Sequence, residues 1–300
     1  MINSNQLKLN NFIFLFSLFF LILGWLTSEG EEIKKLSNVS INLDPNFKIS
    51  QAIVISGYPI QGNLIIAKTD SSNKVQLNKA KIEIDESGVF VIGFNRDDSK
   101  ESILTITNKN KNTFKTSLKP IQRKYNIQRI DGLKQSMVTP PQEVIDRIKN
   151  DRKMVSEARS IRWIKMGDFI RGFDWPLQGP ISGVYGSQRI LNGIPKSPHF
   201  GIDISVPKGT PVLAPAGGII SLADNLYYSG YTVILNHGLK VNSTFLHLDE
   251  IKVEVGDKVN RGDLIGFSGN SGRSTGPHLD WRIDWDGRRL DAAMLAGPME

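Results

Sequence analysis

Three short segments in the second half of the chain hold histidine and aspartate at spacings that suit a metal site. The segments are PHFGID at 198–203, STFLHL at 243–248 and STGPHLDWRI at 274–283. The residues of interest within them are His199, Asp203, His247, His278 and Asp280. Cysteine is absent from the chain, so a metal would have to be bound by nitrogen and oxygen ligands.

The first segment needs a bend to form a metal site. His199 and Asp203 are four residues apart, so on a strand both side chains would point to one face. Full extension over this step spans about 13 Å, which is long for two ligands that each lie about 2 Å from one ion. Gly201 between them and Pro198 before them provide the backbone freedom for the required bend.

The other two segments are expected to be strands. His278 and Asp280 are two residues apart and should share a face, with Leu279 on the opposite face. By the same alternation, Phe245 and His247 are expected to share a face, from which His247 could reach the same cleft. Taken singly, each histidine is more often a packed or surface residue than a catalytic one.

The remaining candidates have simpler interpretations. His237, in LNHGLK, is expected to be a turn histidine near the site but outside it. Arg189 and Arg282 could support a carboxylate or bind substrate, although arginines more often form ordinary structural ion pairs.

Hydrophobic periodicity predicts a mainly β protein with two folded units. Residues 31–137 contain short alternating runs that predict a small β-sandwich-like domain, with a docking, spacing, substrate-presenting or purely structural role. Residues 138–162 predict a helical linker, which begins near Pro141 and carries apolar residues at helical spacing as far as Arg159. Residues 163–300 contain seven expected strands and a short terminal helix.

The N-terminal segment predicts export. The run Phe12–Leu26 is almost wholly apolar, follows Lys8 and precedes acidic residues from Glu29 onward, so its cationic side should stay inside. Residues 1–30 are expected to be a signal peptide or an N-terminal membrane anchor. Since the run is shorter than the roughly 20 residues of a full span and lacks a clear cleavage site, both outcomes stay open. The expected location is the periplasm or the outer face of the cytoplasmic membrane.

The charge pattern limits the choice of partners. The net charge is +7, and a basic cluster could touch anionic wall polymers or lipid headgroups, or could be a solvated strand and loop. It has no accompanying nucleic-acid recognition motif, so nucleic acid is not an expected partner. Membrane contact is expected only through the N-terminal segment. The cluster consists of Lys115, Lys119, Arg123, Lys124 and Arg129.

The region from about Trp175 to Met299 resembles the lysostaphin and LytM-type zinc metallopeptidases, which cut peptidoglycan peptides. Its two halves are VYGSQRILNGIPKSPHFGIDISVPKGTPVLAPAGGIIS and FLHLDEIKVEVGDKVNRGDLIGFSGNSGRSTGPHLDW. The family pattern is H-x-x-x-D, a later histidine in an L-H-L-like strand and a terminal H-x-H. Four of these five polar positions match, and Asp280 stands where the pattern has histidine.

The resemblance implies an antiparallel β, duplicated hybrid motif-like fold for residues 163–300. It implies that His199 and Asp203 bind one zinc ion, with Asp280 in the place of the third ligand. It also implies that His278 acts as the principal general base, while His247 stabilises the oxyanion or shares proton transfer.

Aspartate at position 280 is chemically acceptable, because carboxylate oxygen binds zinc at about the distance of imidazole nitrogen. Two carboxylates and one imidazole would neutralise a divalent ion, so bound water should be acidified less. Oxygen ligation could also admit another divalent metal, such as manganese or iron. A damaged metal site is the competing interpretation.

These observations together predict an exported metal-dependent endopeptidase that hydrolyses peptide bonds in the glycine-rich cross-link or stem of peptidoglycan. The alternative is a noncatalytic LytM-like regulator, which would bind the wall or a cell-envelope partner protein and activate another hydrolase. A secreted carbohydrate-binding or lipid-binding β protein would leave the histidines and aspartates unexplained.

Overall fold

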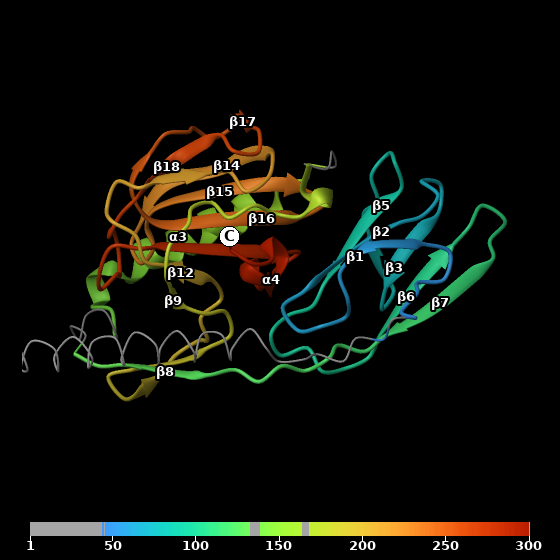
Figure 1. Cartoon of the computed structure of the whole chain (residues 1–300), viewed down its shortest axis with the longest axis horizontal. Coiled ribbons are helices and arrows are strands. Elements are labelled where there is room, and N and C mark those ends of the chain that lie inside the picture. Colours follow the sequence, from blue (N-terminus) through green and yellow to red (C-terminus); the bar gives the residue numbers. More distant parts are fainter. Residues whose placement is uncertain (1–43, 45, 133–138, 164–167, 300) are drawn as a thin grey trace, which may run out of the picture. The chain divides into compact units, whose positions relative to one another are not determined.

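The computed structural model describes residues 44, 46–132, 139–163 and 168–299 (Figure 1). Residues Phe47–Glu300 belong to one compact unit. The apolar run predicted to direct export lies outside the described residues. No helix within the described part of the chain is long and apolar enough to cross a membrane.

Seven strands between residues 53 and 118 form two antiparallel sheets, as expected for a sandwich-like domain. Their strand orders are β1-β2-β5 and β4-β3-β6-β7. Every residue of β5 is buried, and apolar side chains from both sheets join one hydrophobic core. The strands are β1 (Ile53–Ser56), β2 (Leu64–Lys68), β3 (Lys74–Leu77), β4 (Ala80–Ile82), β5 (Val89–Gly93), β6 (Ser102–Thr107) and β7 (Thr113–Leu118).

A ten-stranded antiparallel sheet forms most of the C-terminal part, which confirms the mainly β prediction. Its central order is β17-β14-β15-β16-β19-β12-β9, with β13, β18 and β20 joined at the sides. The strands are β9 (Ile181–Gly183), β12 (Ile202–Ile204), β13 (Pro211–Leu213), β14 (Gly218–Leu226), β15 (Gly230–Gly238), β16 (Val241–Ile251), β17 (Lys258–Val259), β18 (Leu264–Ser268), β19 (Leu279–Trp285) and β20 (Arg288–Leu290).

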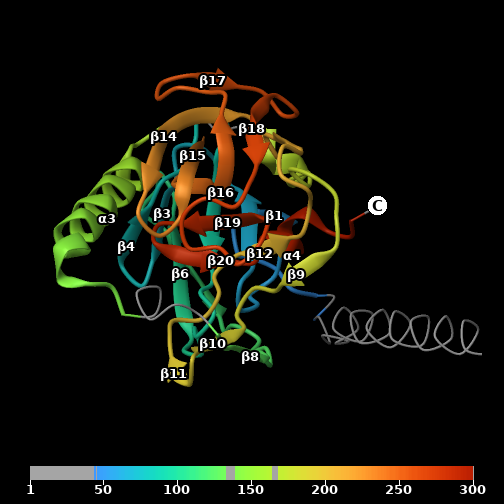
Figure 2. The same ribbon diagram turned by 90° about the vertical axis from the view of Figure 1, so that its left-hand side faces the viewer.

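The predicted helix is present and packs against this sheet. After the short 3₁₀ turn η1 (Gln142–Val144), α3 (Ile145–Ser160) lies beside β14 and β15 (Figure 2). Its Val155 and Ala158 pack against Leu222 and other apolar residues of these strands. The helix ends where Ile161 adopts an extended conformation. Its role as a linker between domains stays a prediction.

A small fourth sheet, of three strands, flanks the site. β8 (Ile127–Ile130) pairs in parallel with β10 (Gln188–Leu191), which pairs with β11 (Ile194–Pro195). Asn192 and Gly193 join β10 to β11 with φ values of 47° and 77°, the combination found in type I′ hairpin turns. There are two further short helices in the described residues, η2 (Asp168–Arg171) and α4 (Ala292–Ala296). The second is the short terminal helix that the sequence predicted.

Candidate metal centre and active site

Strand pairing brings the two candidate aspartate ligands together. β12 lies antiparallel to β19, and Asp203 is directly opposite Asp280. Opposed residues of paired strands point to the same face, so the two carboxylates converge. Both residues are buried. Like charges directly opposite each other destabilise a sheet, so this arrangement requires nearby cations.

The predicted bend before Asp203 is confirmed. β12 begins only at Ile202, and His199 lies in the preceding loop, where its backbone N–H donates to the Ser187 carbonyl at 2.8 Å. A Cβ on Gly201 would lie 2.2 Å from Oδ1 of Asp280, closer than any real contact. Glycine at 201 therefore allows the loop to approach the Asp280 carboxylate, so that His199 can join the two aspartates.

His199, Asp203 and Asp280 form a set that fits a metal ion. One ligand atom from each residue can be chosen so that all three atoms lie within 4.8 Å of one another. Nε2 of His199 lies 2.9 Å from Oδ1 of Asp203, yet both atoms are buried without a hydrogen bond. Buried polar atoms normally have hydrogen-bond partners, so lone pairs that converge in this way suit the binding of a cation.

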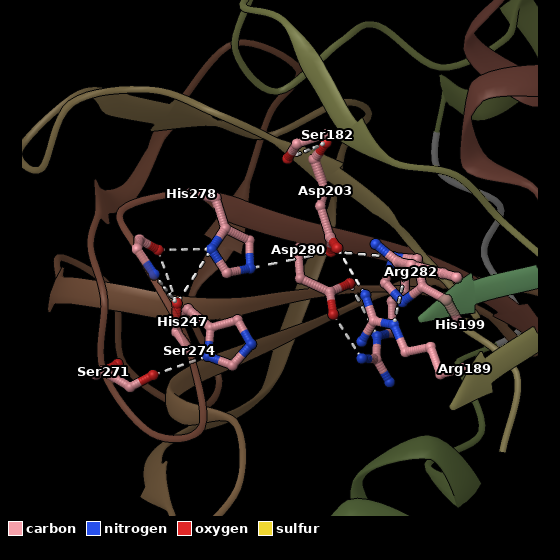
Figure 3. Close-up of polar contacts among 12 residues, drawn as sticks. Ser182, Arg189, His199, Asp203, His247, Ser271, Ser274, His278, Asp280 and Arg282 are labelled. Carbon is pink, nitrogen blue, oxygen red and sulfur yellow. Dashed lines mark hydrogen bonds and ion pairs between the residues drawn. The ribbon is translucent and has the colours of Figure 1, made fainter. Parts of the chain in front are cut away.

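Two arginines support the aspartate ligands (Figure 3). Nη2 of Arg189 lies 2.7 Å from Oδ2 of Asp203. Arg282 donates from Nε and Nη2 to the two carboxylate oxygens of Asp280, at 2.9 and 2.5 Å. These are the carboxylate-supporting contacts expected for Arg189 and Arg282.

Contacts with His199 and with the two arginines keep both carboxylates ionised. Burial raises the pKa of Asp280, but the charges of Arg282 and His199 outweigh it and hold that pKa below its ordinary value. For Asp203, burial and the charge of Asp280 raise the pKa, while the contacts with His199 and Arg189 bring it below its ordinary value. Each carboxylate oxygen has further lone pairs, so these contacts leave room for a metal.

The structure changes the expected charge of the metal centre. A neutral site was expected because aspartate adds a negative charge where the family pattern has histidine. Arg282 lies beside Asp280 and adds one positive charge in return. The positive charge of Arg282 therefore offsets the negative charge that Asp280 adds. For this reason, charge alone no longer predicts that metal-bound water is less acidic than in the family pattern.

A β-bulge places His247 at the site. Between Val233 and Tyr231 of β15, the partner strand β16 runs from Phe245 to Leu248, one residue more than the pairing requires. His247 itself has a φ of 62°, which is rare for a residue other than glycine.

The bulge makes one prediction from strand alternation wrong. Phe245 packs opposite Trp281 in the core, whereas Leu246, opposite Asp280, and His247 both line the cavity on the other face. Phe245 and His247 therefore do not share a face. The extra residue reverses the alternation, and strained backbone of this kind is common at functional sites.

The two candidate catalytic histidines lie side by side with defined orientations. Their ring centroids are 4.9 Å apart. Nδ1 of His247 donates to the Ser271 carbonyl, and Nδ1 of His278 donates to the Gly276 carbonyl, each at 2.8 Å. A carbonyl only accepts, so each neutral ring carries its proton on Nδ1 and keeps an acceptor at Nε2.

Nε2 of His278 faces the metal centre, 4.0 Å from Oδ1 of Asp203. Burial is the main effect that lowers the pKa of His247, and the nearby charge of Asp280 only partly opposes it. At neutral pH His247 is therefore unprotonated at Nε2.

His237 lies outside the site, as predicted, but it is not a turn residue. It lies within β15, is fully buried and contacts the ring of Phe173. Nδ1 donates to the Gly217 carbonyl at 2.9 Å, and Nε2 accepts from Ser243 at 2.8 Å. Burial lowers its pKa to about 4, so at neutral pH it is an uncharged core residue.

A cleft of about 680 Å³ contains His199, Asp203, Asp280 and both catalytic candidates. Two arginines that line this cleft or the cavity beside it were not among the predicted site residues. Arg159 belongs to the predicted helix, and Arg273 lies in the glycine-rich loop before His278. Neither position carries a local motif, so only the folded chain reveals them.

Part of the C-terminal domain is similar in sequence to known proteins. Residues 197–292 match the sequence model described as peptidase family M23. The chain is 42% identical over 103 residues to peptidoglycan DD-endopeptidase ShyA of Vibrio cholerae, covering 34% of the chain and 24% of that protein. It is 37% identical over 100 residues to DD-carboxypeptidase/endopeptidase Mpg of Neisseria meningitidis, covering 33% and 23%. The chain thus matches about a quarter of the length of these relatives.

A solved structure from Pseudomonas aeruginosa, named for peptidase M23, has a similar fold. Its TM-score is 0.63 at 24% identity, and the match covers 82% of this chain and 98% of that one. This likeness concerns the fold alone. The matched segment, residues 197–292, contains all five predicted site residues. By its sequence model, segment 197–292 of this chain is therefore a peptidase M23 domain.

Proposed function

We propose that the protein is an exported zinc-dependent endopeptidase that hydrolyses peptide bonds in peptidoglycan. The observation that carries the proposal is the convergence of His199, Asp203 and Asp280 beside His247 and His278 in one cleft. The relatives named as peptidoglycan endopeptidases support the choice of substrate. The apolar N-terminal run supports export to the periplasm or to the outer face of the cytoplasmic membrane.

The metal would be held by His199, Asp203 and Asp280. Zinc in such a site supplies a Lewis acid that polarises a carbonyl and lowers the pKa of water. Arg189 and Arg282 keep the two carboxylates ionised and fix their orientation. His199, Asp203 and Asp280 are all buried, so their ligand atoms are shielded from bulk water.

The histidine pair would accept and donate the proton that the attacking water loses during hydrolysis. His278 accepts it at Nε2, because its Nδ1 is held by the Gly276 carbonyl and its Nε2 faces the metal ligands. His247 is fixed in the same tautomer by Ser271. Its Nε2 can therefore donate to an oxyanion only after it has itself gained a proton.

The test compares the purified full chain with His199→Ala and His278→Ala. The wild type should contain about one zinc ion and release soluble fragments from peptidoglycan. His199→Ala should lose both metal and activity. His278→Ala should keep its metal but lose at least about 100-fold in rate, the usual contribution of a general base. A wild-type protein that binds zinc yet releases no more product than His199→Ala would refute the enzyme proposal.

A noncatalytic wall-binding regulator is the second candidate. The observation in its favour is that Arg282 contacts both carboxylate oxygens of Asp280. If this ion pair replaces the third ligand, the wild type should bind no zinc and Asp280→His should acquire it. Zinc binding by both proteins would support the enzyme.

A further inference from the structure

Five arginines surround a second cavity next to the metal centre. This cavity, of about 280 Å³, is lined by His247 and Asp280 as well as by the arginines. Its volume is below that of a typical whole-ligand pocket, so it suits one group of a larger substrate. The arginines are Arg159 of α3, Arg189 of β10, Arg273 of the loop before β19, Arg282 of β19 and Arg289 of β20.

These arginines are bound into the fold rather than extended into solvent. Arg159 lies 2.9 Å from Asp284 and donates to Thr244 at 3.1 Å. Arg289 lies 3.5 Å from the same Asp284 carboxylate, and Arg273 stacks 4.3 Å over the ring of Tyr228. The cavity therefore has a preformed cationic wall.

Positive charge exceeds negative charge around this cavity. Arg159 and Arg289 share a single carboxylate, that of Asp284. Arg189 and Arg282 pair with Asp203 and Asp280, the two carboxylates that the metal centre would use. Once a divalent cation is bound there, the cationic excess grows by two charges.

Burial makes this excess unfavourable in the absence of an anion. Removal from water lowers the pKa of Arg159 to about 10, although Asp284 opposes the shift. Burial likewise lowers the pKa of Arg289 below its ordinary value. Nε of Arg159 is buried, and its partner is the Asp284 carboxylate that Arg289 shares. A bound anion would compensate these desolvated cations.

We propose that this arginine-lined cavity binds a free carboxylate of the substrate peptide, close to the bond that is cleaved. The inference rests on the proposed peptidase function and narrows its substrate to stem peptides that carry carboxylates, rather than neutral glycine cross-links. Planar guanidinium groups bind carboxylates through paired hydrogen bonds. Because His247 and Asp280 line this cavity as well as the catalytic cleft, a carboxylate bound here lies beside the proposed catalytic groups.

The first test measures binding of a peptidoglycan stem tetrapeptide to the full chain by calorimetry. Three forms are compared: the free acid, the form amidated at the C-terminal α-carboxylate, and the form amidated at the side-chain carboxylate. Amidation of the recognised group should weaken binding about 10- to 100-fold, which also identifies that group. Equal affinities of all three forms would overturn the proposal.

Arginine variants test whether the preference for the free acid depends on this cavity. Arg289→Gln should bind the acid and the amide with nearly equal affinity. The variant has lost the guanidinium group that the peptide carboxylate contacts, so amidation of that carboxylate has little further effect on binding. Arg288→Gln is the matched control: this neighbour stacks over Trp285, lies 3.8 Å from Asp98 and does not line the cavity. It should keep the wild-type preference. Equal loss in both variants would show a general charge effect and refute the site.

Metal content and thermal unfolding are recorded for each variant. If Arg289→Gln unfolds, Arg289→Lys replaces it; lysine keeps the charge but not the paired geometry, so it should show a reduced preference for the acid. These binding measurements do not require turnover. A protein that prefers the acid but cleaves nothing would refute the proposed peptidase and retain the carboxylate site.

Discussion

The pairing of Asp280 with Arg282 is the residue-scale feature that most changes the interpretation of this site. Aspartate in place of histidine raised the question of whether the domain can hold a metal. The structure shows both Asp280 oxygens bound by Arg282, while Asp280 also lies within reach of His199 and Asp203. The substitution is therefore accompanied by a compensating charge beside the metal-ligand candidates.

This pairing predicts the effect of Asp280→Asn. The change removes the counter-ion of Arg282, whose side chain is only 27% exposed, and should lower the free energy of unfolding by about 3 kcal/mol. It should also weaken zinc binding. Urea denaturation and metal analysis measure the two effects. The double variant Asp280→Asn/Arg282→Gln should regain most of the stability but not the metal. Full recovery of metal in the double variant would contradict the ligand assignment.

At the scale of elements, the site depends on close contact between the loop before β12 and strand β19. Asp203 and Asp280 meet because these strands are paired, and His199 joins them because Gly201 lets the loop approach. The bulge in β16 then turns His247 toward the same cleft. Three departures from a regular strand thus position the site residues: the late start of β12 at Ile202, the close contact at Gly201 and the bulge in β16.

The glycine contact predicts that Gly201→Ala disrupts the metal centre. The new methyl group would lie 2.2 Å from Oδ1 of Asp280 and 2.9 Å from the Trp281 carbonyl, so the loop or the strand must move. Zinc affinity should fall by at least about 10-fold, as for changes that misplace a ligand. Gly217→Ala is the control, because its nearest contact would be an ordinary 3.4 Å. Unchanged zinc affinity in Gly201→Ala would show that the loop adapts.

At the scale of the whole molecule, the N-terminal sheets and the C-terminal domain share contacts within one compact unit. Arg123 forms an ion pair of 2.8 Å with Asp291, and the Asp291 N–H donates to the Gly62 carbonyl at 2.7 Å. Apolar residues from both parts belong to the same core cluster. The domain division proposed at residues 137 and 162, the export segment and the cell-envelope partner stay predictions.

The shared contacts predict cooperative unfolding of both parts. Hydrogen exchange in increasing denaturant should give the same opening free energy for amides of β5 and of β16, because neither part loses its contacts alone. Asp291→Ala should lower both values together. Opening of β5 at clearly lower denaturant than β16 would show instead that the N-terminal sheets fold as an independent domain.

The sequence by itself determined the class of the protein and the residue types of its site. Alternating apolar runs predicted a mainly β chain, and helical spacing predicted α3. The resemblance of the histidine and aspartate pattern to the lysostaphin and LytM-type family predicted which side chains would form the site. These features are local, or depend on spacing that survives folding, so they could be recognised without coordinates.

Only the tertiary structure decided how the site is charged and oriented. Strand alternation assigned His247 to the face of Phe245, because a bulge leaves no local signature in FLHL. Arg282 was a candidate support, but its contact with both Asp280 oxygens depends on side-chain orientation. The arginine cavity gathers residues from Arg159 to Arg289, and long-range packing alone determines which of these charges are buried together.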